Sequence, residues 1–191
     1  SDPYVRNEAI RVLGESGGDG QLLTQRLIPL LVDENAMVNA STLAALGYIG
    51  PEASAAVPAL KTMLSTSPNV NVARALWQIE GRSESVLPFY LSILENPDLK
   101  SGAYRPAYKA IQELDDVAEE VVPVLIEVLK SEPKKGYAYI MRLREAMETL
   151  AAFGSSAKSA LPELERIASS DQRHLVKQAA AAIEEIESSI N

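Results

Sequence analysis

The sequence contains no cysteine, a single histidine (His174) and only 5% aromatic residues. The lack of cysteine excludes disulfides, thiolate nucleophiles and zinc or iron–sulfur sites built on cysteine. A single imidazole also falls short of the two or three that a catalytic metal site normally uses. We therefore predict that the protein holds no metal ion and no cofactor.

Positive charge is also scarce, because 18 Lys and Arg residues face 26 Asp and Glu residues, which gives a net charge of −8. A field of this sign opposes attraction to phosphate backbones and to anionic lipid. No apolar run approaches the ~18 residues that a membrane span needs, and the first residues do not resemble a signal peptide. We expect a soluble monomer without membrane contact, with the cytoplasm as the favoured compartment and nucleic acid as a disfavoured partner.

The most informative feature that is present is an internal repeat. Apolar segments carry a proline at one place, at spacings of 29, 30, 35 and 39 residues, namely Pro29, Pro58, Pro88, Pro123 and Pro162. A second, small and apolar segment lies between them, and its anchors recur at spacings of 33, 30, 35, 39 and 33 residues, namely Leu13, Leu46, Leu76, Ile111, Leu150 and Ile183. Two independent sets of anchors therefore agree on the period.

Both kinds of segment predict helices. Between Val38 and Ile49 the apolar side chains fall on one broad stripe of a helix. The prolines are expected in or near first turns, where a missing N–H costs least, although Pro29 lies far enough inside to indicate a kink. Ten clusters of turn residues separate the segments, and no stretch alternates with a period of two. The prediction is eleven helices and no sheet.

A helix pair of this size cannot bury its own apolar face, so neighbouring pairs should stack as in an α-solenoid. The segment from Val38 to Leu60 resembles a HEAT repeat, of the bacterial type grouped with the phycobilisome-lyase HEAT-like repeats, through Thr42-Leu43-Ala44-Ala45-Leu46-Gly47, Gly50-Pro51 and Val57-Pro58-Ala59-Leu60. The resemblance is close over residues 5–64 and looser beyond residue 65. It implies an all-α fold, a right-handed α-solenoid of about eleven helices, with five full pairs and an initial unpaired helix.

We expect one HEAT-like array over residues 1–191. The first helix, predicted over residues 3–13, lacks the partner that would cover Val5, Ile10, Val12 and Leu13, which indicates a piece of a longer protein. The sequence departs from the HEAT pattern at three places, which are Asn39, Trp77 and the added length of residues 131–140.

Two patterns that suggest catalysis have better structural explanations. Ser16 stands in a G-x-S-x-G sequence, but a helix instead of a strand precedes it and the only histidine lies far along the chain. The acids Asp115, Asp116, Glu119 and Glu120 suit the start of a helix, whose dipole favours negative charge. We therefore predict that the protein is not an enzyme.

The polar positions of the second segments are the best candidates for function. In a HEAT-like array these helices line the concave surface, and counting from the anchors places six side chains on or beside a common ladder, namely Tyr48, Arg74, Trp77, Gln78, Arg105 and Lys109. Aromatic and arginine side chains on such a face are typical of binding hot spots. Two structural alternatives stay open: Arg74 and Lys109 pair with nearby acids, and Trp77 fills a gap.

Five of the seven tyrosines lie between residues 90 and 139, where the repeats are least regular. Such stretches carry function in many scaffolds, with repacking around the insertion as the alternative. The leading hypothesis is a non-enzymatic scaffold that binds a protein or peptide along its concave face. The alternatives are an accessory subunit of an enzyme, such as a bilin-lyase-like protein, a HEAT-like nucleic-acid binder, and a structural spacer in an assembly.

Overall fold

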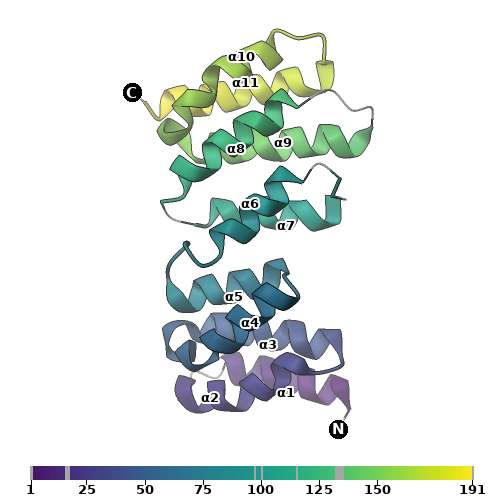
Figure 1. Ribbon diagram of the computed structural model, residues 1–191, viewed down its shortest axis with the longest axis vertical. Coiled ribbons are helices and arrows are strands. Elements are labelled where there is room, and N and C mark those ends of the chain that lie inside the picture. Colours follow the sequence, from purple (N-terminus) through teal and green to yellow (C-terminus); the bar gives the residue numbers. More distant parts are fainter. Residues whose placement is uncertain are drawn as a thin grey trace. The chain divides into compact units, whose positions relative to one another are not determined.

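The computed structural model describes residues 2–15, 18–96, 98–99, 101–114, 116–131 and 136–190. These ranges form eleven α-helices and three short 3-10 helices, and they contain no strand (Figure 1). The prediction of an all-α fold is confirmed. Ser16 and Asp115 lie outside the described residues, as do residues 132–135 of the predicted insertion.

The helices occur in pairs. We call one member of each pair a first helix, and these are α2 (Gly20–Leu27), α4 (Val57–Thr66), α6 (Leu87–Glu95), α8 (Ala118–Lys130) and α10 (Leu161–Ala168). The second helices are α1 (Pro3–Glu15), α3 (Ala36–Ile49), α5 (Val70–Glu80), α7 (Ser101–Gln112), α9 (Tyr137–Ala152) and α11 (Arg173–Ser188). This order matches the predicted five pairs after an initial single helix.

The chain divides into two compact units, Ser1–Val86 and Leu87–Asn191, which we call unit 1 and unit 2. In unit 1, α3 packs against both α1 and α5. In unit 2, α9 packs against both α7 and α11, and the first helices α6 and α8 lie against each other. The grouping of all 191 residues into one continuous array stays a prediction.

The predicted anchors form the core of each unit. Leu46 and Leu76 in unit 1, and Ile111 and Leu150 in unit 2, have 0% exposure. The anchors of the first and last helices are only partly buried, because α1 and α11 each pack against a second helix on one side only. The repeat register read from the sequence is therefore correct in both units.

Turn residues between the repeats begin several helices. The side chain of Asp19 accepts hydrogen bonds from the backbone N–H groups that open α2, Asn35 does the same for α3, and Asn69 for α5. Asn and Asp are favoured there because their oxygens satisfy N–H groups that have no partner within the helix. These caps explain why α2, α3 and α5 start where the sequence predicts a turn.

Prolines lie in three different settings. Pro58 and Pro162 occupy the first turns of α4 and α10, as predicted. The kink predicted at Pro29 is a change of helix type, because α2 ends at Leu27 and the 3-10 helix η1 (Ile28–Val32) follows. The expectation is wrong for Pro123, which lies inside α8; its ring is exposed, so water can reach the carbonyl that the missing N–H leaves without a partner.

The same corner occurs twice in the chain. After α3 the 3-10 helix η2 (Gly50–Ala56) leads into α4, and after α9 the 3-10 helix η3 (Gly154–Ala160) leads into α10. Each corner opens on a glycine with positive φ, 67° at Gly50 and 54° at Gly154, where a side chain would be strained. Because the two corners match, the repeat that the sequence shows most clearly before residue 65 is also present around residues 154–160.

The outer face of α1 carries part of the apolar surface that the sequence predicts. Val5 and Val12 are 59% and 51% exposed. The prediction is wrong for Ile10, which is only 2% exposed, because it points to the side of α1 that packs on α3.

Leu46 tests the core of unit 1. Because its side chain has 0% exposure, we expect Leu46→Ala to lower the free energy of unfolding by about 2–5 kcal/mol, through lost burial and the cavity left behind. Leu22→Ala is the matched control, since this leucine on α2 is 48% exposed and should cost below about 1 kcal/mol. Urea denaturation followed by circular dichroism measures both, and equal costs would contradict the register.

Candidate partner-binding surfaces

Three of the predicted binding residues lie on neighbouring helices of unit 1. Tyr48 lies near the end of α3, and its side chain is 72% exposed. Arg74 and Gln78 lie four residues apart on α5, which places them on one face of that helix, and both are exposed. We call Tyr48, Arg74 and Gln78 the unit 1 surface.

A close approach between α3 and α5 brings Gln78 against Gly47, the residue that precedes Tyr48. A Cβ atom added to Gly47 would overlap Oε1 of Gln78 and would lie 3.6 Å from Cα of Ala75. The amide of Gln78 therefore rests on α3 at the residue that precedes Tyr48. Glycine allows this contact, because a side chain at position 47 would displace the flexible amide of Gln78.

Trp77 lies next to this surface but is not an open part of it. Its side chain is half-buried, and its backbone carbonyl accepts the hydrogen bond from Gly81 that ends α5 (2.8 Å). Partial burial favours the structural alternative, in which the indole fills space within unit 1.

The remaining two predicted residues lie in unit 2. Arg105 and Lys109 are four residues apart on α7, and both are exposed. Nε of Arg105 lies 2.6 Å from Oε1 of Glu145, whose side chain is only 6% exposed. Arg105 therefore forms an ion pair with a neighbouring acid, the kind of contact that the sequence left open as an alternative for Arg74 and Lys109. The structure describes two sets of residues, one in each unit, and their union in one ladder stays a prediction.

The sequence reasoning missed a buried polar cluster between α7 and α9. Arg142 and Glu145 on α9 are 9% and 5% exposed, and the guanidinium of Arg142 donates a hydrogen bond to the backbone carbonyl of Leu94 at the end of α6. Two charged residues three apart on a buried helical face break the pattern of apolar core positions, and that break is the signal in the sequence.

Two buried tyrosines of α7 border this cluster. The rings of Tyr104 and Tyr108 meet edge to face with 5.9 Å between their centres. The Tyr104 hydroxyl donates to the carbonyl of Ala138 (3.0 Å), whereas the Tyr108 hydroxyl lies near the guanidinium of Arg142 and, in the described part of the chain, makes no hydrogen bond of good geometry. Tyr90 is buried as well. For these three tyrosines the structure favours repacking over a binding role.

Burial also shifts the pKa values of the Tyr104 and Tyr108 hydroxyls. It raises the pKa of Tyr108 to about 12, against the opposing effect of the nearby Arg142 guanidinium, which favours the ionised hydroxyl through its charge and as a hydrogen-bond donor. The pKa of Tyr104 is raised as well, first by burial and then by the negative charge of Glu145. Both hydroxyls therefore stay neutral at physiological pH.

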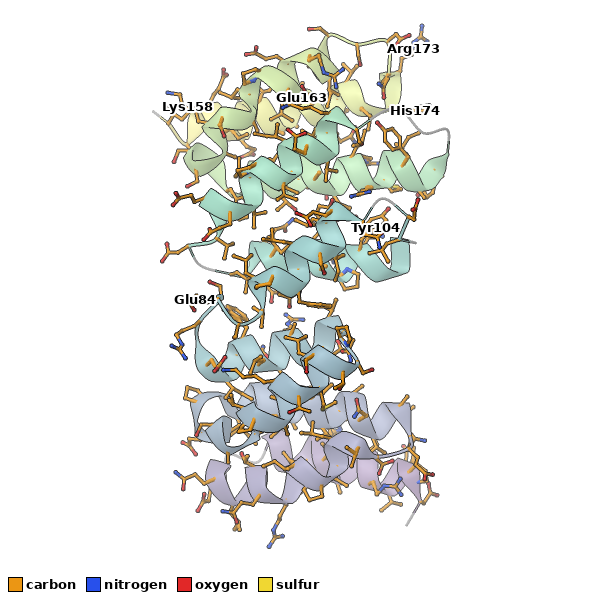
Figure 2. The ribbon with its side chains drawn as sticks, in the orientation of Figure 1. Glu84, Tyr104, Lys158, Glu163, Arg173 and His174 are labelled. Carbon is orange, nitrogen blue, oxygen red and sulfur yellow. The ribbon has the colours of Figure 1, made fainter. Side chains whose placement is uncertain are left out.

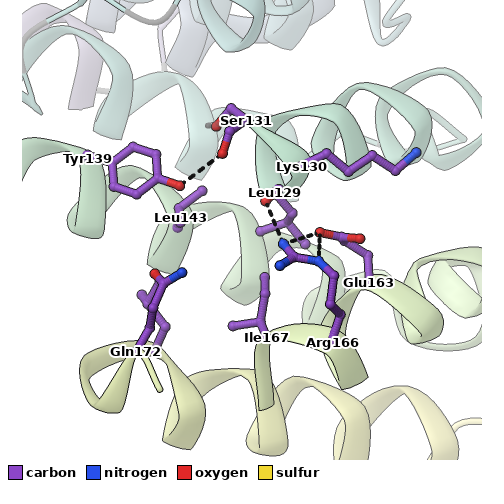
Figure 3. A pocket seen from close by; sticks show the side chains of 10 residues that line it. Leu129, Lys130, Ser131, Tyr139, Leu143, Glu163, Arg166, Ile167 and Gln172 are labelled. Carbon is purple, nitrogen blue, oxygen red and sulfur yellow. Dashed lines mark hydrogen bonds and ion pairs between the residues drawn. The ribbon is translucent and has the colours of Figure 1, made fainter. Parts of the chain in front are cut away.

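A small hollow of about 140 Å³ is lined by the end of α8 and by residues of α9, α10 and α11 (Figure 3). Arg166 on its wall lies 2.5 Å from the carboxylate of Glu163, and the Tyr139 hydroxyl donates to the carbonyl of Ser131 (3.1 Å). Because these polar groups already have partners within the protein, this hollow offers little to a ligand. Tyr139 thus provides a hydrogen-bond donor for the backbone carbonyl that follows α8. Tyr137, also in the predicted insertion, is 77% exposed.

The remaining sequence candidates lie at exposed helix starts. Glu119 and Glu120 occupy the first turn of α8, as predicted, and both are exposed. His174 is exposed near the start of α11, and Figure 2 shows it at the opposite end of the last helix pair from Lys158. Among the described residues, three or more His, Cys, Asp or Glu nowhere group as metal ligands. No helix in these ranges is long and apolar enough to cross a bilayer.

The two tyrosines of α7 allow a matched test of the buried cluster. Tyr108→Phe removes a buried hydroxyl that makes no hydrogen bond of good geometry with the described residues, so the free energy of unfolding at neutral pH should stay the same or rise by up to about 1 kcal/mol. Tyr104→Phe removes the bond to Ala138 and should cost about 1 kcal/mol. Urea denaturation compares the two, and the reverse ranking would show that the Tyr108 hydroxyl is engaged.

Alkaline pH gives an independent check of Tyr108. Its raised pKa means that the unfolded chain loses this proton first, so its stabilising contribution is complete below pH 10 and disappears as pH rises to about 12. Wild type should lose about 2 to 3 kcal/mol more than Tyr108→Phe over this interval. Identical pH profiles would contradict the burial of an ionisable hydroxyl at this position.

Comparison with known proteins supports the prediction of helical repeats. The family model of HEAT repeats matches residues 1–78. The crystal structure of an engineered protein from the Northeast Structural Genomics Consortium superimposes with a TM-score of 0.54, covering 99% of this chain and 93% of that chain at 21% sequence identity. No curated protein matches the chain. Residues 1–78 are therefore similar to HEAT repeats, and the chain shares the all-α fold of the engineered protein.

Proposed function

We propose that this HEAT-repeat chain is a non-enzymatic scaffold that binds an extended, acidic segment of a partner protein, acting as a monomer. One observation carries the proposal: the ring of Tyr48 is 72% exposed, and Gln78, which lies against the preceding Gly47, shares one face of α5 with the exposed Arg74. Exposed aromatic and arginine side chains on neighbouring helices are residue types that interfaces favour over the rest of a protein surface.

The shape and chemistry of this surface support binding over catalysis. The unit 1 surface is formed by side chains that project from two packed helices, and such a surface suits an extended segment. Acid–base catalysis needs paired groups whose surroundings separate their pKa values. The unit 1 surface contributes a guanidinium, an amide and a phenol.

Unit 2 contributes a second positive position in this proposal. Lys109 is exposed on α7, and it is the better candidate there because Arg105 already pairs with Glu145. Arg74 and Lys109 would attract acidic residues of the partner, and exposed charges of this kind act mainly on the association rate and on specificity.

The resemblance to bilin-lyase HEAT-like proteins supports a second candidate, an accessory subunit whose surfaces hold a catalytic partner. A nucleic-acid ligand is less favoured, since the chain carries a net charge of −8. Both alternatives also use Arg74 and Lys109. They differ in the ligand, which is a catalytic partner protein in one and nucleic acid in the other, so one binding experiment distinguishes them.

Charge reversal tests the proposed surface. The double variant Arg74→Glu with Lys109→Glu should lose most of the partner that the wild-type chain recovers from a native lysate, because two attractive contacts become repulsive. Its melting temperature should stay nearly unchanged, since exposed charges contribute about 0–1 kcal/mol each. Pull-down with quantitative mass spectrometry measures recovery, and differential scanning calorimetry measures stability.

The control carries the same change of charge elsewhere. Arg26 on α2 and Lys158 on η3 are exposed, and their double reversal should leave recovery intact. Equal recovery by wild type and both variants would contradict the proposed surface. Single-stranded and duplex DNA are tested beside the lysate, and DNA binding that falls steeply with salt would replace the protein-partner proposal with the nucleic-acid one.

A further inference from the structure

A larger hollow of about 400 Å³ lies within unit 2, on walls supplied by α6, α8 and α9. Pro123, Val124 and Val128 of α8 form its apolar side, and Glu95, Glu127 and Ser131 provide polar groups. Arg142 of α9 completes the lining. The volume falls within the range of about 300–1,000 Å³ that is typical of ligand sites, and a mostly apolar wall with a few polar groups is also typical of them.

The guanidinium of Arg142 acts as a fixed part of the wall. It donates a hydrogen bond to the carbonyl of Leu94, at the end of α6 where backbone carbonyls lack partners within the helix. The side chain is only 9% exposed, and Glu145 stands three residues away on the same face of α9, where the opposite charges are neighbours. Arg142 therefore has a structural role that does not require an anionic ligand.

The open side of the hollow favours a positive charge. Glu95 and Glu127 are both exposed on the helices that line it, and the helices α6 and α8 both end there, with the partial negative charge of a helix C-terminus. Lys130 lies 2.9 Å from Glu127, in a pair whose side chains are 52% and 72% exposed. Exposed pairs of this kind exchange partners at little cost, so Glu127 remains accessible to an incoming cation.

We propose that this hollow is a docking site for a peptide segment of a protein partner in which a large apolar side chain adjoins basic residues. The apolar side chain fills the space against Val124 and Val128, and the basic side chains meet Glu95 and Glu127. A peptide suits the site because a single buried side chain flanked by charged contacts is the usual form of a peptide anchor. The site shares no residue with the unit 1 surface or with Lys109. An experiment can therefore contradict this proposal without contradicting the function proposed above.

Nuclear magnetic resonance of valine methyl groups in the full chain tests the site with the capped peptide acetyl-Phe-Lys-Lys-amide. We expect saturable shifts of the Val124 and Val128 methyl signals, with a dissociation constant on the order of millimolar for so small a ligand. Three matched peptides separate the contributions: acetyl-Ala-Lys-Lys-amide lacks the large apolar side chain, acetyl-Phe-Gln-Gln-amide lacks the charge, and acetyl-Phe-Glu-Glu-amide reverses it. The Phe-Lys-Lys peptide should bind most tightly and should weaken as salt is added.

Substitutions at the rim complete the test. Glu95→Gln with Glu127→Gln should weaken binding of the basic peptide by about three- to tenfold and leave the neutral peptide unaffected. Glu119→Gln with Glu120→Gln is the matched control on α8, because these exposed acids lie at its other end and should change neither affinity. Both double variants replace exposed side chains with others of the same shape, so the fold is retained.

Four results would overturn the proposal. They are the absence of shifts at Val124 and Val128 up to about 10 mM peptide, well above the expected dissociation constant; equal binding of the alanine peptide; equal or tighter binding of the acidic peptide; and an unchanged affinity of the basic peptide for the Glu95→Gln and Glu127→Gln variant. Tighter binding of the acidic peptide would show that Arg142 governs the hollow, which would then be a carboxylate site.

Discussion

The close packing of second helices against one another is the constraint on which the other features of each unit depend. In unit 1, α3 lies against both α1 and α5, and its contact with α5 uses small residues, with a Cβ at Gly47 able to reach 3.6 Å from Cα of Ala75. Ala73 and Ala75 are 0% and 2% exposed. Because these residues let the helices approach, Leu46 and Leu76 are excluded from water, and the opposite faces of the same helices become exposed.

This packing determines where partner contacts are available. A helix that buries one face between two neighbours presents only a narrow outer strip, and on α5 that strip holds Arg74 and Gln78. In unit 2 the helix α9 departs from the rule by burying two charges, Arg142 and Glu145. Both charges have partners, a carbonyl of α6 and Arg105 of α7, so they join α9 to its neighbours through polar contacts where α3 and α5 rely on small apolar residues.

The fold was largely predictable because it follows from local patterns. Helical periodicity, a repeated proline and a repeated leucine position indicate eleven helices and the buried anchors, and the turn residues Asp19, Asn35 and Asn69 indicate where helices begin. The two errors have different causes, a tertiary contact at Ile10 and the starting point of a helix at Pro123. Ile10 was expected on an open face and is buried against α3, and Pro123 lies within α8 because the helix starts at Ala118 and places the ring toward water.

The sequence by itself determined the helical class, the repeat register and the identity of polar residues on the second helices, because these depend on spacings within one helix. Only the tertiary structure decided which of those residues have partners: Arg105 pairs with Glu145 across two helices, and Gln78 lies on Gly47. The hollow beside Arg142 was also beyond sequence reasoning, since three helices separated along the chain form its walls. Spacing along one helix specifies direction around its axis, whereas a pocket depends on how neighbouring helices pack.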